Sequence, residues 1–94
     1  MFVLITYDVA TTDKAGTRRL RRVAQVCKDF GQRVQNSVFE CKVDAKSWVL
    51  FRTRLLKEIK EEEDSLRIYF LETDTEIEHF GTKGPVDFEA PLII

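Results

Sequence analysis

The chain opens with a nearly continuous apolar, β-branched run from Met1 to Tyr7, which limits the folds open to it. A run of this kind and length is typical of a strand buried in the middle of a sheet. The turn-forming and helix-capping residues at 8–13 end this strand. The whole chain has 94 residues, which is one small domain. A monomer of this size is only marginally stable, and oligomerisation is one usual remedy.

Hydrophobic periodicity predicts two amphipathic helices. The first runs from about Lys14 to Phe30, with Gly31 as a plausible C-cap. The second runs from Ala45 to about Lys60, with Asp44 as its N-cap. Their apolar stripes are Leu20, Val23, Ala24 and Cys27 in the first helix, and Trp48, Phe51, Leu55 and Ile59 in the second.

The remaining apolar segments predict further strands. The stretch 33–43 is rich in valine and reads as one strand with a bend or bulge near Asn36 and Ser37, or as a short hairpin. Residues 66–71 form another strand. Residues 73–91 are mostly irregular, and the apolar end 92–94 is expected to pair with a sheet edge, its own or a neighbour's.

The order strand, helix, strand or strands, helix, strand predicts an α+β fold, a ferredoxin-like split βαβ sandwich. It has an antiparallel sheet with two helices on one face. The core spans residues 1–72, and 73–94 form a tail with a terminal strand. This fold hosts many functions, so it says little about chemistry.

Composition excludes several classes of protein. Two cysteines make no dense disulfide scaffold, one histidine makes no multi-histidine site, and no apolar run is long enough for a membrane span. We therefore expect a cytoplasmic protein with reduced thiols. The net charge is −1, yet residues 14–33 hold seven basic residues and one acid, whereas residues 58–78 hold nine acids and two basic residues. This asymmetry indicates a basic surface for an anionic partner or merely a solvated helix face.

Asp8 is the first candidate for chemistry, because it follows a strand that should be buried. Its carboxylate either caps the following loop and helix or binds a ligand. One carboxylate is a poor Mg²⁺ site, but a twofold dimer could bring two copies together. Tyr7 either completes the core or holds a phosphate. Cys27 and Cys41 are predicted to be small core residues, and His79 a surface residue.

The basic side of the first helix is the second candidate, either for nucleic-acid phosphates or for solubility alone. Its basic residues are mainly arginines, which bind phosphate bidentately, and this favours phosphate. In the following stretch, Ser37 could satisfy a bulge and Phe39 could be core or could stack on a base.

Three segments together resemble a known family. They are Tyr7-Asp8-Val9 at the first strand's end, Gly31-Gln32-Arg33-Val34-Gln35-Asn36-Ser37-Val38-Phe39-Glu40, and Glu63-Asp64-Ser65-Leu66-Arg67-Ile68-Tyr69. Over roughly residues 1–71 the chain closely resembles the CRISPR-associated protein 2 family, the small subunit of the spacer-acquisition machinery. The family fold is ferredoxin-like.

The resemblance implies a homodimer in which two copies of Asp8 face each other and bind a divalent metal, Mg²⁺ or Mn²⁺. It implies endonuclease activity on RNA or double-stranded DNA and a bridging role between dimers of the CRISPR-associated protein 1 integrase. In the family the tail adds a strand to the other subunit's sheet. The implied catalytic residues are Asp8, Tyr7 and Ser37, and the implied nucleic-acid or active-site neighbours are Arg18, Arg19, Arg33 and Phe39. The basic side of the first helix adds Lys14 and Arg22 as predicted nucleic-acid contacts.

Three other functions stay open. One is a messenger-RNA-cleaving toxin of the virulence-associated protein D type, which shares the fold and an acid at the strand end. Another is a DNA-bridging scaffold without catalysis, because the sequence shows no second acid–base residue. The last is a regulatory module for a small ligand, which would not need the arginine-rich helix.

Overall fold

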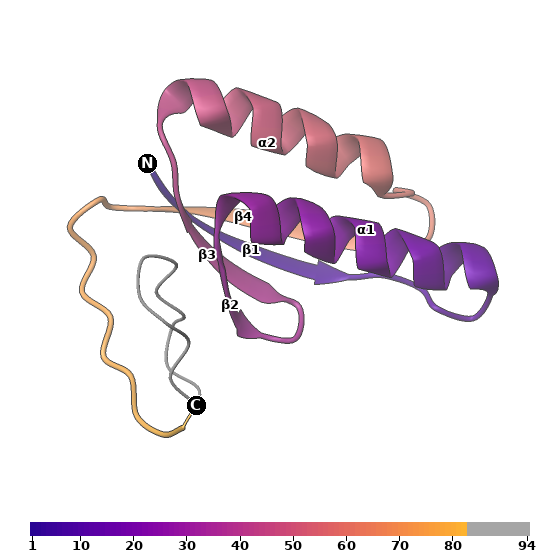
Figure 1. The fold of residues 1–94 in the computed structure, drawn as a ribbon, viewed down its shortest axis with the longest axis horizontal. Helices are drawn as coiled ribbons and strands as arrows, with labels where there is room; N and C mark the ends of the chain where they lie inside the picture. The colour runs from indigo at the N-terminus through magenta and orange to yellow at the C-terminus, as the bar shows by residue number, and fades with distance from the viewer. Residues whose placement is uncertain (83–94) are drawn as a thin grey trace.

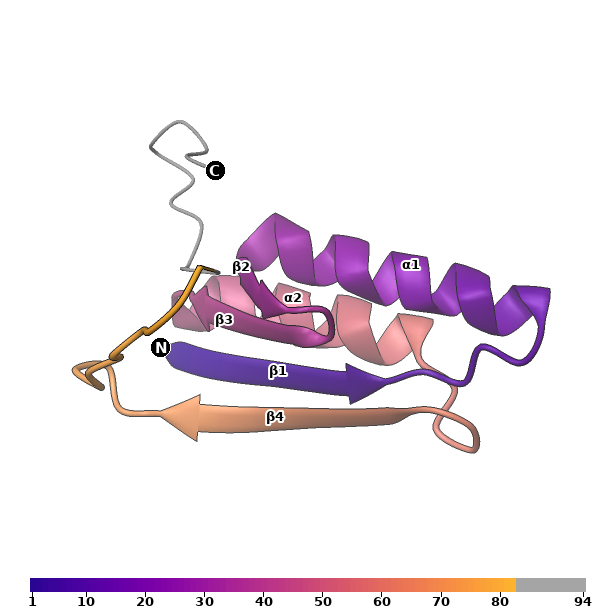
Figure 2. The ribbon, with the colours of Figure 1, turned by 90° about the horizontal axis from the view of Figure 1, so that it is seen from below.

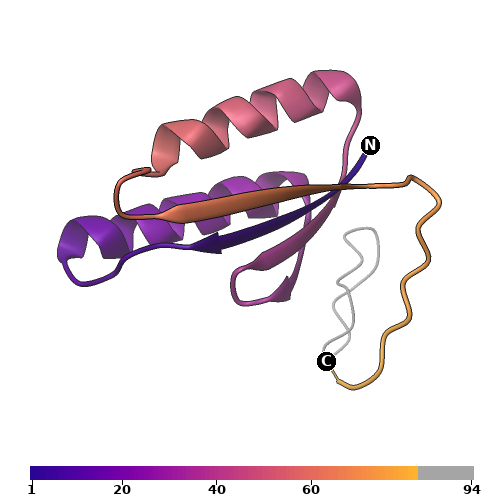
Figure 3. The ribbon, with the colours of Figure 1, turned by 180° about the vertical axis from the view of Figure 1, so that it is seen from behind.

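The computed structural model describes residues 1–82. Its elements follow the order β1 (Phe2–Asp8), α1 (Lys14–Phe30), β2 (Gln32–Gln35), β3 (Val38–Lys42), α2 (Ala45–Glu58) and β4 (Ser65–Leu71). The strands form one antiparallel sheet in the order β2-β3-β1-β4, so β1 is central, as the apolar run predicted. Both helices lie side by side on one face of the sheet (Figures 1 and 2), and the opposite face is turned to the viewer in Figure 3. The predicted ferredoxin-like fold is confirmed.

The helix boundaries follow from local capping. Asp13 accepts a hydrogen bond from the Gly16 amide at 2.7 Å, and Asp44 accepts one from the Ser47 amide at 2.7 Å. These caps satisfy amide groups that have no partner within the helix. The Gly31 amide donates to the Cys27 carbonyl at 2.8 Å and ends α1 at the predicted place.

The valine-rich stretch forms the hairpin that the sequence left as one of two possibilities. β2 and β3 flank a turn at Asn36 and Ser37, and the pairing shifts by one residue between Arg33 and Gln35. A register shift of this kind is a β-bulge, which bends the strand. The hairpin therefore curves beside α1, and its turn lies against β1, where the Tyr7 amide donates to the Ser37 carbonyl at 3.1 Å.

The core fills the space between the helices and the sheet. Alternate residues of β1, namely Val3, Ile5 and Tyr7, point into it. Cys27 and Cys41 are both fully buried there, as predicted. Burial raises the pKa of each of these two thiols to about 12, so they stay neutral and act as small apolar side chains.

The segment after β4 leaves the body of the fold. As far as residue 82 it contains no helix or strand, and it runs across the end of the sheet toward the hairpin (Figures 1 and 2). The predicted terminal strand at 92–94 lies outside the described residues. Neither α1 nor α2 is both long enough and apolar enough to cross a membrane.

Candidate nucleic-acid and metal site

Asp8 is the last residue of β1 and is exposed. Because side chains alternate along a strand, Asp8 points to the face opposite Tyr7. That face is the one that the helices leave uncovered. Across the sheet, Asp8 pairs with Ser65, the first residue of β4. The carboxylate is therefore open to metal, phosphate or a second copy of the chain.

Tyr7 lies on the helix side of the same strand and is 7% exposed. Its hydroxyl donates to the Asn36 carbonyl at 3.4 Å, and its ring stacks on Phe39 with 6.2 Å between ring centroids. Burial raises the pKa of Tyr7, and the nearby Arg33 and Ser37 side chains oppose part of this rise. Tyr7 is thus a neutral phenol that fastens the hairpin turn to β1.

The structure therefore separates the two residues of the Tyr7-Asp8 pair. They are neighbours in sequence, but the sheet lies between their side chains. Tyr7 belongs with Arg33, Ser37 and Phe39 on the helix side, whereas Asp8 stands on the uncovered side. A single compact centre that uses both side chains does not follow from this fold.

Arg19 forms a charged cluster with Asp64, a residue that sequence reasoning missed. Arg19 Nε lies 2.9 Å from Asp64 Oδ2, and Arg19 Nη2 lies 3.1 Å from Asp64 Oδ1. The Asp64 side chain has no exposed surface, and the Arg19 side chain is 15% exposed. Hydrogen bonds from Arg19 hold the pKa of Asp64 at about 2, below its usual value. Although predicted as a nucleic-acid contact, Arg19 is engaged within the protein, and its bidentate geometry is that of a strong ion pair.

The same carboxylate holds two backbone segments near Asp8. Asp64 also accepts hydrogen bonds from the Ala10 amide at 3.2 Å and the Lys60 amide at 2.8 Å. Ala10 lies two residues after Asp8. Asp64 directly precedes Ser65, which is the strand partner of Asp8. The α1 backbone also packs closely here, since a Cβ on Gly16 would overlap the Ala10 carbonyl. We call the Arg19–Asp64 pair and its backbone bonds the Asp64 clamp.

The other predicted contacts divide into exposed and buried residues. Lys14, Arg18 and Arg22 are exposed on α1 and free to meet an anion. Arg33 is exposed and lies over the Phe39 ring, 5.1 Å from its centroid. Phe39 itself is fully buried, so its ring supports Arg33 and Tyr7 from below and offers no surface to a base.

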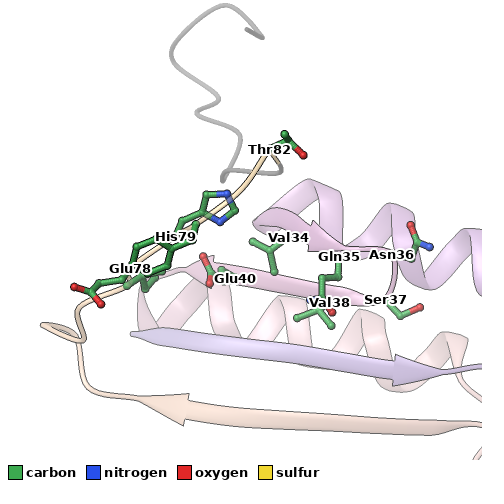
Figure 4. A pocket seen from close by; sticks show the side chains of 11 residues that line it. Val34, Gln35, Asn36, Ser37, Val38, Glu40, Glu78, His79 and Thr82 are labelled. Atoms are coloured by element: carbon green, nitrogen blue, oxygen red, sulfur yellow. The ribbon is translucent and has the colours of Figure 1, made fainter. Parts of the chain in front are cut away.

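Ser37 occupies the hairpin turn and is partly buried. It lines a pocket of about 840 Å³ between the hairpin and the segment 77–82, which Figure 4 shows from close by. Glu40 and His79 also line this pocket. His79 is exposed, as predicted, and its Nε2 lies 3.1 Å from the Gly81 carbonyl oxygen. Asp8 is not among the residues that line this pocket.

The described part of one chain does not by itself form a metal site. Within residues 1–82, no group of three histidine, cysteine or carboxylate side chains is placed to hold a metal ion. Asp8 contributes one exposed carboxylate oxygen pair, which suits a hard cation such as Mg²⁺ when other oxygens complete the shell. A second copy of Asp8 or a phosphate would supply such oxygens. Asp8 therefore fits a metal site that is shared with a second copy of the chain or completed by a phosphate of the substrate.

Comparisons with known proteins agree on one family. Residues 1–77 match the family CRISPR associated protein Cas2. A protein of Moorella thermoacetica named CRISPR-associated endoribonuclease Cas2 1 is 53% identical, and the match covers all of both chains. A protein of Halalkalibacterium halodurans named CRISPR-associated endonuclease Cas2 is 54% identical over 99% of both chains.

Solved structures give the same result. The crystal structure of Streptococcus pyogenes Cas2 at pH 6.5 is 49% identical, with a TM-score of 0.75. The match covers 86% of this chain and 100% of that one. Together with the ferredoxin-like sheet and the exposed acid at the end of β1, these matches show that the chain belongs to the Cas2 family of CRISPR-associated proteins.

Proposed function

We propose that this protein is a nuclease of the CRISPR system that hydrolyses phosphodiester bonds with a divalent metal bound at Asp8. The observation that carries the proposal is the exposed carboxylate of Asp8 at the end of β1, in a chain about half identical to relatives named endoribonuclease or endonuclease. Family membership favours this function over the toxin alternative.

Asp8 would bind Mg²⁺ or Mn²⁺, together with phosphate oxygens of the substrate. A metal bound there would activate water and offset the charge on the phosphate. The Asp64 clamp holds the backbone two residues after Asp8 and directly before Ser65, its strand partner, so the backbone that carries the carboxylate is fixed. Exposed Lys14, Arg18 and Arg22 would attract the nucleic-acid backbone without reading its sequence.

The active form in this proposal is a homodimer that associates through the uncovered face of the sheet. An antiparallel sheet whose face is turned to water normally shows polar side chains there. Here that face carries Leu4, Val38, Tyr69 and Leu71 beside its polar residues, and Tyr69 is 42% exposed. Two copies joined through this face would supply two Asp8 carboxylates to one metal.

The dimer would serve CRISPR adaptation by bridging copies of the CRISPR-associated protein 1 integrase on DNA. Membership of the Cas2 family supports this role. A scaffold of this kind needs the dimer and the basic surface but not hydrolysis. Cleavage and bridging are therefore separable by substitution of Asp8.

The test compares the wild type with Asp8→Ala on labelled single-stranded RNA and double-stranded DNA, with Mg²⁺, Mn²⁺ or EDTA. We expect one substrate to be cleaved by the wild type only when metal is present, and Asp8→Ala to reduce cleavage to the level without protein. Glu62→Gln, an exposed acid in the loop before β4, is the matched control and should cleave normally. Equal cleavage by the wild type and Asp8→Ala would refute a nuclease centred on Asp8.

A further inference from the structure

A second pocket lies between α1 and the β2–β3 hairpin, on the helix side of the sheet. Its volume is about 540 Å³, within the ~300–1,000 Å³ of pockets that bind small ligands. The polar residues that line it are Tyr7, Arg21, Gln25, Lys28, Arg33, Asn36 and Ser37. It is separate from Asp8, whose side chain is on the other side of the sheet.

The residues that line the pocket carry positive charge and no negative charge. Asp29 lies beside the lining residue Gln25, but it is paired with Arg54 at 2.8 Å. Arg21, Lys28 and Arg33 line it, and no aspartate or glutamate does. The ion pairs among residues 1–82 involve none of these three cations. Cations gathered in a concave site focus a positive potential, so the pocket favours an anion.

The cations come from two elements that are held in place. Arg21 and Lys28 are seven residues apart on α1, which is two helical turns, so they lie on the same side of the helix. Arg33 comes from β2 and lies over the buried Phe39 ring. The hairpin is bound to β1 through the backbone and hydroxyl of Tyr7. The backbone that carries these three cations is therefore in place before any ligand binds.

The remaining lining suits an anion with an organic part. Ser37 and Asn36 offer hydrogen-bonding groups, and Leu20 and Ala24 of α1 form an apolar patch. Arginine pairs with phosphate bidentately, and an apolar patch takes a sugar or base. The volume exceeds that of a bare phosphate ion.

We propose that this pocket binds one nucleotide of a nucleic-acid strand, with its phosphate against Arg21, Lys28 and Arg33. The inference rests on the proposed function only for the choice of nucleic acid as ligand. It assigns Arg21 and Lys28, from the basic side of α1, to one defined pocket together with Tyr7 and Arg33. Affinity for the nucleic acid then depends on residues on the helix side of the sheet, and hydrolysis depends on Asp8 on the uncovered side.

The first experiment measures the affinity of Arg21→Gln/Lys28→Gln for a labelled single-stranded RNA by fluorescence anisotropy at several salt concentrations. Each lost phosphate contact lowers the slope of log Kd against log salt by about 0.7, so we expect a decrease of up to about 1.4. Lys46→Gln/Lys57→Gln removes two exposed lysines from α2 and should leave the slope unchanged. Equal losses in both double variants would overturn the pocket in favour of diffuse attraction.

The second experiment follows the backbone amide signals of Asn36 and Ser37 by NMR during titration with adenosine 5′-monophosphate or inorganic phosphate. We expect the nucleotide to shift these signals at lower concentration than phosphate alone, and the shifts to be lost in Arg21→Gln/Lys28→Gln. Equal potency of the two probes would overturn the nucleotide in favour of a simple phosphate site. If the wild type binds RNA with the expected dependence of log Kd on log salt but cleaves no substrate, the proposed hydrolysis is refuted and the proposed binding pocket is still supported.

Discussion

Asp64 shows how much one side chain can hold together. Its buried carboxylate accepts hydrogen bonds from Arg19 and from two backbone amides, which lie on separate segments of the chain. Removal of one partner of a buried ion pair leaves the other charge without compensation. The Arg19 side chain keeps some contact with water. We therefore expect removal of the Asp64 charge to cost less stability than the largest values known for buried ion pairs.

We predict that Asp64→Asn lowers the free energy of unfolding by about 2–3 kcal/mol. The reason is that Arg19 loses its charged partner. An asparagine also has only one acceptor oxygen, so the backbone amides of Ala10 and Lys60 cannot both keep their own acceptor. Urea denaturation followed by circular dichroism measures the change. Asp29→Asn is the matched control, because Asp29 pairs with Arg54 at 2.8 Å on the surface and both side chains are more than a third exposed. Surface pairs contribute about 0–1 kcal/mol, and an equal effect of the two variants would contradict the clamp.

The clamp also predicts a pH dependence. Asp64 has a pKa of about 2 in the folded chain and about 3.9 when unfolded. A group whose pKa is lowered on folding stabilises the fold fully above its unfolded pKa, and this stabilisation is lost as the pH falls through the folded pKa. The Tm of the wild type should therefore decline between about pH 4 and pH 2. In Asp64→Asn this decline should be shallower, and identical curves would refute the assignment.

At the scale of elements, much of the fold could be predicted from local signals. The apolar run of β1, the stripes of α1 and α2, and the caps at Asp13 and Asp44 are all encoded within a few residues. The helices therefore began where predicted, although α2 ends at Glu58, slightly before the expected Lys60. The hairpin was left open because its bulge depends on pairing between strands, which no local pattern reports.

Only those residues of the candidate site could be predicted whose exposure follows from their position along a strand. Asp8 was found because it ends an apolar strand. The engagement of Arg19 was not predictable, because Asp64 lies 45 residues away in sequence and only the fold brings them together. For Phe39 the sequence offered the core or a base as neighbours, and its full burial confirms the core.

The first turn of α1 gives a prediction that runs against helix propensity. Alanine in place of a helical glycine usually stabilises by about 1 kcal/mol. At Gly16 the added Cβ would meet the Ala10 carbonyl, so α1 would have to move away from the loop after β1. We expect Gly16→Ala to destabilise the fold by about 1–3 kcal/mol. Thermal unfolding checks the sign, and a higher Tm would show that the contact is loose.

At the scale of the whole molecule, the sheet has one face covered by helices and one that the helices leave open, where the segment 77–82 lies beside the hairpin. The uncovered face carries both Asp8 and partly exposed apolar residues, so the proposed dimer and the proposed metal site share it. The outer face of α2 is a rival surface, because Val49 is 65% exposed and Leu50 is 55% exposed. The two surfaces make different predictions for association.

We predict that Tyr69→Lys shifts the protein from dimer to monomer and reduces cleavage, because the lysine charge would be buried against the partner sheet. Val49→Lys should leave both properties unchanged. Sedimentation velocity across a range of protein concentrations measures the association. Dissociation by Val49→Lys alone would place the interface on α2 and refute association through the sheet.

The alternation along β1 restricts which changes in length this protein tolerates. Tyr7 and Asp8 serve opposite sides of the sheet only because the strand keeps its register. A single inserted or deleted residue within β1 would turn the tyrosine outward and bury the carboxylate in the core, exchanging the two roles. Substitutions can accumulate in this strand one at a time, but a change of length cannot.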